Sequence, residues 1–173
     1  MKPIIQSIKN KLAEIKLRYS RNDDGLYLFF YTDPNASDMN EVWLTTSIAQ
    51  NIVLKKKNSG INWDTVKAVY PDRNETVKFK FDKSSEYVIY ISKANRLTKI
   101  TLDDTTVYCP LENFSRMTSL QLLSIMNTNI TGNINELKKL PFLSILCVSS
   151  KYIKGINKNT FNNWPSIKMH EVD

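Results

Sequence analysis

The spacing of hydrophobic and polar residues changes twice along the chain, and the changes divide it into three zones. In the first zone, residues 3–19, apolar side chains recur with the 3, 4, 3 spacing of a helical seam. The seam residues are Ile5, Ile8, Leu12 and Ile15. Pro3 suits the first position of a helix. The pattern predicts an N-terminal amphipathic helix within residues 1–20.

This predicted helix allows three interpretations. It packs against its own domain, or it associates with copies of itself, or it lies on a membrane surface. The third interpretation is the weakest because the segment has no Trp or Phe anchor. In coiled coils, isoleucine at both kinds of seam position favours bundles of three or four helices over pairs of helices. We therefore expect a homo-oligomer, with a trimer favoured.

The second zone, residues 21–95, contains runs that are typical of β-strands. The clearest runs are 26–31, 41–46, 66–70, 77–81 and 87–91, and several end at Pro or Asp. Residues 77–81 alternate apolar side chains with lysine, which predicts one buried and one solvated face. This zone therefore predicts a small antiparallel β-rich cap domain.

The third zone, residues 96–173, repeats. Leu97, Leu120 and Leu143 are 23 residues apart, and each begins a pattern close to L-x-x-L-x-L-x-x-T-x-L. Gly132 and Gly155 share one offset in this repeat. Copies of this kind cannot bury their apolar sides alone, so stacking is expected.

The repeat resembles the leucine-rich repeat family, and the segment 127–132 (Asn-Thr-Asn-Ile-Thr-Gly) is similar to short arrays in gut Bacteroidetes and their bacteriophages. The family's ladder asparagine is replaced by Thr105, Thr128 and Lys151. The resemblance implies binding or scaffolding without chemistry. The expected fold class is α+β or mostly β. It comprises an N-terminal helix (1–20), a cap domain (21–95) and a leucine-rich-repeat solenoid of about three 23-residue repeats (96–173).

Aligning the copies also predicts which side chains point away from the core. Large apolar residues fall at outward positions, where a solvated sheet face would carry polar ones. They are Leu122, Met126, Ile145 and Met169. Either a partner protein or the chain's own N-terminal helix is expected to cover them, and we favour a partner.

Charge adds little to this picture. The formal net charge is +7, but lysine supplies 19 of the 24 basic residues and arginine only five. Specific nucleic-acid readers rely on the bidentate contacts of arginine, so a nucleic-acid partner is not expected. No apolar run reaches the roughly 18 residues that a membrane span needs.

Residues suited to chemistry are scarce. His170 is the single histidine, and Cys109 and Cys147 occupy different offsets of the repeat, so they should not meet. The adjacent acid pairs, at 23–24 and 103–104, both read as turns. Phosphate-binding and dinucleotide-binding glycine patterns are absent. We expect no enzyme, no metal and no cofactor.

These observations favour a structural or interaction protein, a homo-oligomeric component of a bacteriophage particle. The alternative is a bacterial surface or secreted adhesion module, which needs export. No signal peptide is seen in the opening residues, so the expected location is the virion or the bacterial cytoplasm.

Overall fold

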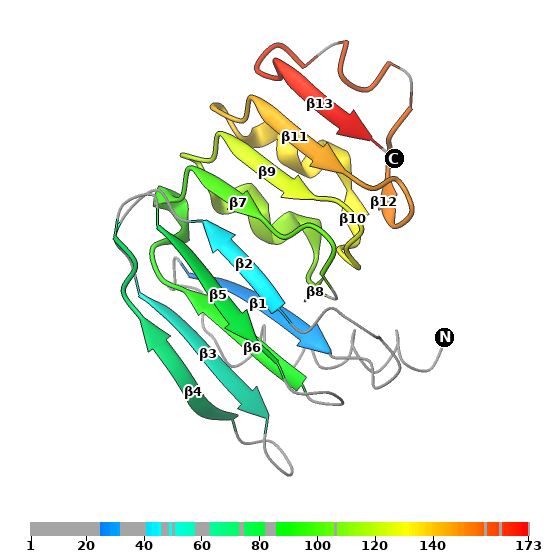
Figure 1. Ribbon diagram of the computed structural model, residues 1–173. Helices are drawn as coiled ribbons and strands as arrows, with labels where there is room; N and C mark the ends of the chain where they lie inside the picture. The colour runs from blue at the N-terminus through cyan, green and yellow to red at the C-terminus, as the bar shows by residue number, and fades with distance from the viewer. Residues whose placement is uncertain are drawn as a thin grey trace.

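The structure is a computed structural model, shown in Figure 1. It describes residues 25–31, 41–45, 49, 51–57, 63–72, 75–81, 86–105, 107–157, 159–162 and 164–172. The strands within these ranges form four sheets.

The largest sheet has five strands in the order β4-β3-β6-β1-β8. Its strands are β1 (Leu26–Tyr31), β3 (Ile52–Lys57), β4 (Trp63–Val69), β6 (Glu86–Ile91) and β8 (Val107–Tyr108). All of its strand pairs are antiparallel. Leu26 and Leu28, two residues apart on β1, are both buried because alternate side chains of a strand point to the same face.

A two-stranded antiparallel sheet joins β2 (Glu41–Thr45) to β5 (Thr76–Lys80). On β5, Val77 and Phe79 are buried, whereas Thr76 and Lys78 are exposed. The alternation of apolar residues and lysine expected for this run is therefore present in the structure.

The third sheet is parallel and has the order β13-β11-β9-β7. Its strands are β7 (Lys99–Thr101), β9 (Leu122–Ile125), β11 (Ile145–Val148) and β13 (Met169–Val172). Paired residues on β7, β9 and β11 are 23 residues apart, as in Ile100–Leu123–Leu146, and the last step, from Leu146 to His170, is 24. Figure 1 shows these strands side by side, from green to red.

The return segments contain 3-10 helices and short strands. The 3-10 helices are η1 (Ala94–Arg96), η2 (Leu111–Arg116) and η3 (Ile134–Lys139), and the strands β10 (Gly132–Asn133) and β12 (Ile153–Lys154) pair in parallel. Leu111 and Phe114 from η2 and Leu137 from η3 are fully buried. The return segments thus close the core behind the parallel sheet.

One continuous cluster of buried apolar side chains runs from Leu26 in the first strand to Trp164 near the C-terminus. The cluster includes Ile89 from the five-stranded sheet, Phe79 from the two-stranded sheet and Leu123 from the parallel sheet. The antiparallel and parallel sheets therefore share a core.

The predicted fold class is wrong. Within the part of the chain that the structure describes, the helical segments are three short 3-10 helices, and the strands are divided among several sheets, both parallel and antiparallel. The described part of residues 96–173 does not form the leucine-rich-repeat solenoid that was expected: four of its strands form one parallel sheet, but β8 leaves this segment to pair with β1. Strands of two to four residues bury little surface by themselves, so their apolar sides merge with the core of the antiparallel sheets.

The predicted N-terminal helix (1–20), with its oligomerisation seam at Ile5, Ile8, Leu12 and Ile15, lies outside the described residues. Among the residues that are described, none of the helices is long and apolar enough to cross a membrane.

Candidate functional site

The parallel sheet has two faces of different character. Ile100, Leu123 and Leu146, which follow one another across β7, β9 and β11, are at most 2% exposed and face the core. The residues that precede them in the chain, Lys99, Leu122 and Ile145, must point to the opposite face, because successive side chains alternate along a strand.

Three of the residues predicted to bind a partner form one row on this opposite face. Leu122 pairs with Ile145, and Ile145 pairs with Met169, so the three lie side by side on β9, β11 and β13. Neighbouring strands are roughly 5 Å apart, which lets large side chains touch. Leu122 and Ile145 are half-buried, and Met169 is 54% exposed. We call Leu122, Ile145 and Met169 the apolar row.

Met126, the fourth predicted residue, lies apart from this row. It follows the end of β9, four residues after Leu122, or roughly 13 Å along the strand direction. Its backbone N–H donates to Asp103 Oδ1 at 2.8 Å, and its carbonyl accepts from Asp104 N at 2.9 Å. Met126 is half-buried, and its backbone helps to hold the turns at the carboxyl ends of β7 and β9.

The next row on the same face consists of Thr101, Ser124, Cys147 and Glu171. Ser124 occupies an outward position on β9, yet it is only 7% exposed. Its hydroxyl donates to the Asp103 carboxylate, with both oxygens at 2.8 Å. The repeat alignment places Asp103 at an outward position. It does not show that the Asp103 carboxylate turns toward Ser124.

Polar side chains connect successive turns at the carboxyl ends of these strands. Asp104 and Asn127 both have left-handed backbones, with φ of 56° and 52°. Asn127 Nδ2 donates to Asp104 Oδ1 at 2.9 Å, and Asn127 N donates to Ser149 Oγ at 2.6 Å. The acid pair at 103–104 is thus engaged in structural hydrogen bonds, as its interpretation as a turn suggested.

Neither cysteine nor carboxylate geometry indicates chemistry at this face. Cys109 and Cys147 are free thiols, and Cys109 is 2% exposed, so burial raises the pKa of its thiol far above the ordinary value. Cys147 is half-buried on the outward face, one row from Ile145. Among the described residues, His, Cys, Asp and Glu side chains form no group that could hold a metal ion.

Charge is distributed unevenly around the apolar row. Lys99 is exposed and lies beside Leu122, at the amino end of the sheet. Glu171 is exposed two residues beyond Met169, toward the carboxyl end, where Asp103 and Asp104 also lie. The arrangement is an apolar strip with a basic residue at one side and acidic residues at the other, which suits recognition of another protein better than catalysis.

Comparison with known proteins gives no match: no family model matches the chain, and no curated protein or solved structure does.

Proposed function

We propose that the chain is a non-enzymatic interaction protein that binds a partner protein through the outward face of the parallel sheet. The observation that carries the proposal is the apolar row. Leu122, Ile145 and Met169 are in register on three adjacent strands, away from the core. Covering three side chains of this size contributes a few kcal/mol at roughly 25 cal/mol per Å².

The surroundings of the row support a protein partner rather than a small molecule. Lys99 and Glu171 border it with opposite charges, and Thr101 and Cys147 offer weakly polar contacts. A polar rim around an apolar centre is typical of protein interfaces, where the centre supplies binding energy and the rim supplies register.

The biological setting follows from the repeat's resemblance alone. It favours a component of a bacteriophage particle, in the virion or in the bacterial cytoplasm before assembly. A bacterial surface or secreted adhesion module is the alternative. Homo-oligomerisation through residues 1–20 is a separate proposal, and it does not require the apolar row.

The experiment compares a double variant, Leu122→Ser with Ile145→Ser, with a control, Phe142→Ser. Phe142 is also a large exposed apolar residue, at 63%, but it lies in the turn before β11 and outside the row. Both proteins should melt within about 5 °C of the wild type, because none of the three side chains belongs to the buried core.

Partner binding is read out by a photoactivatable maleimide attached to Cys147, which neighbours the row. The wild type and Phe142→Ser should crosslink the same protein from an extract of the phage-infected or host cells, and the double variant should lose it. If the double variant keeps the crosslinked protein, the row is not the binding surface. If it unfolds instead, the row is internal and the partner must bind elsewhere.

A further inference from the structure

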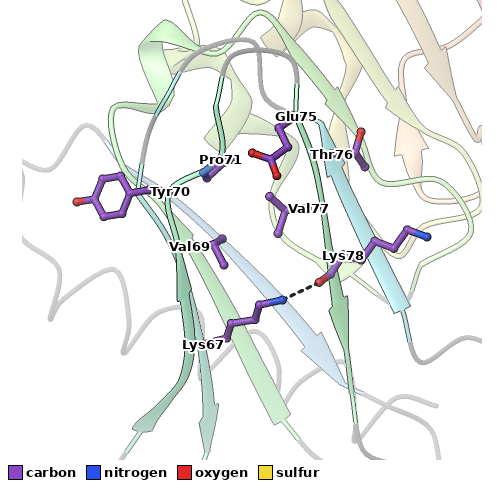
Figure 2. Close-up of a pocket in the computed structure, with 8 residues that line it drawn as sticks. All are labelled: Lys67, Val69, Tyr70, Pro71, Glu75, Thr76, Val77 and Lys78. Atoms are coloured by element: carbon purple, nitrogen blue, oxygen red, sulfur yellow. Dashed lines mark hydrogen bonds between the residues drawn. The ribbon is translucent and has the colours of Figure 1, made fainter.

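Two strands that end their sheets, β4 and β5, lie on the same side of the described part of the molecule. Among the described strands, β4 pairs with β3 and ends the five-stranded sheet, and β5 pairs with β2. A cavity of about 260 Å³ lies between these edges. Figure 2 shows its lining, with Lys67 and Val69 from β4 facing Val77 and Lys78 from β5.

Lys67 crosses this opening. Its register partner on β3 is Leu54, which is 2% exposed and belongs to the core, so Lys67 points toward the inside of the sandwich. Its ammonium donates to the Lys78 carbonyl at 3.4 Å, the dashed line in Figure 2. The same ammonium lies 5.6 Å from the centre of the Phe79 ring, which is only 1% exposed.

Lys67 is exposed at this edge, so its ammonium stays accessible to solvent while it reaches across the opening. Open edges present unpaired backbone groups to other chains, and proteins protect them with inward charges and bulges. β4 has both devices, because its pairing with β3 shifts register between Leu54 and Lys55, next to Lys67. Lys67 also occupies a carbonyl acceptor on the β5 edge, which an added strand would need.

The β5 edge is suited to a second copy of itself. In an antiparallel β5–β5 pair centred on Lys78, Val77 of each copy would oppose Phe79 of the other, on the face that is buried in the single chain. Opposed apolar side chains stabilise an antiparallel pair. Such a pair can form only if the lysine that spans the opening moves away.

We propose that Lys67 closes the open side of the sandwich and prevents a second copy of this chain from pairing along β5. The ammonium of Lys67 makes both contacts, since it donates to the Lys78 carbonyl and lies over the Phe79 ring. This inference is independent of the apolar row, which lies on the parallel sheet.

The test is a comparison of Lys67→Met, Lys67→Arg and Lys138→Met. Lys67→Met keeps a side chain of similar length but removes the hydrogen-bond donor and the charge, and Lys67→Arg keeps both. Lys138 is an exposed lysine on η3, so Lys138→Met controls for the loss of one positive charge from a total of +7. Molar mass is measured by light scattering, and amide hydrogen exchange is measured over Thr76–Lys80.

The expected result is that Lys67→Met at least doubles the molar mass relative to the wild type and slows exchange of the β5 amides. Lys67→Arg and Lys138→Met should keep the wild-type mass and exchange. The proposal is overturned if Lys67→Met keeps the wild-type mass, if it associates without protecting β5, or if Lys138→Met associates equally. If Lys67→Met unfolds, the test depends on Lys67→Arg, which keeps the charge. Association of folded Lys67→Arg along β5 would equally overturn the proposal.

Discussion

The antiparallel sheets have mostly longer strands than the parallel sheet, as β4 with seven residues and β9 with four show, and the two parts expose opposite kinds of surface. The open side of the antiparallel part carries lysines, with Lys67 turned inward and Lys78 outward. The outward face of the parallel part carries Leu122, Ile145 and Met169. The antiparallel part is therefore protected against pairing with other chains, whereas the parallel part leaves apolar surface available for contact.

The two regions also differ in how they reach the core. In the parallel part, buried residues recur at a fixed interval, as Ile100, Leu123 and Leu146 do. In the antiparallel part, strands that are distant in the chain are neighbours in the sheet, as β1 and β6 are. Yet both regions contribute side chains to the same buried cluster.

The largest expected effect is that of Leu123→Asp. Leu123 is 0% exposed, so the variant buries a charge without a partner, which costs several kcal/mol, comparable with the whole stability of a domain. Because the core is continuous, the antiparallel strands should unfold together with the parallel ones. Circular dichroism and tyrosine fluorescence would both report this loss. A folded antiparallel part that survives alone would instead support independent domains divided near residue 95.

A smaller effect is expected for Ser124→Asp. The new carboxylate would replace a hydroxyl that donates to Asp103 and would repel the Asp103 carboxylate. We expect a loss of about 2–3 kcal/mol in the free energy of unfolding, against about 1 kcal/mol for Ser124→Ala. If the two variants have equal denaturant midpoints at pH 7, repulsion by the Asp103 carboxylate does not contribute to the loss of stability.

Gly132→Ala should be destabilising by a similar or smaller amount. Gly132 has φ of 154°, and a Cβ added there would lie 2.7 Å from Leu111 Cβ, which is fully buried. Strain of this kind costs about 1–3 kcal/mol. Urea denaturation measures the change, and a midpoint equal to that of the wild type would mean that β10 and the start of η2 are not packed this closely.

The smallest effect concerns the thiols and changes no stability. Cys147 on the outward face should react with a maleimide in the native protein, whereas Cys109 should not react until the chain unfolds. Burial excludes the reagent from Cys109 and raises its pKa, so little thiolate is present near pH 8. Mass spectrometry of labelled peptides distinguishes the two sites. Fast labelling of Cys109 would contradict the burial of the return segments.

The sequence predicted some of these features and missed others for physical reasons. The 23-residue interval placed Leu122 beside Ile145 because a constant interval between parallel strands translates directly into register. The same interval did not reveal that β8 pairs with β1, because that pairing joins segments with no shared spacing. Lys67 read as an ordinary polar residue of a strand, since its role depends on Phe79 and Lys78 from another sheet.

The amino-acid sequence was enough to predict the alternation of buried and exposed positions along β5 and the interval at which positions repeat. These are local properties, since they follow from the two-residue period of a strand and from the length of one repeat unit. Only the tertiary structure decided that the parallel and antiparallel sheets share one core and that Ser124 turns toward Asp103. It also decided that Lys67 spans the gap between two strand edges. These outcomes depend on contacts between distant segments, whose geometry is set by how the sheets pack and by how each buried polar group finds a hydrogen-bond partner.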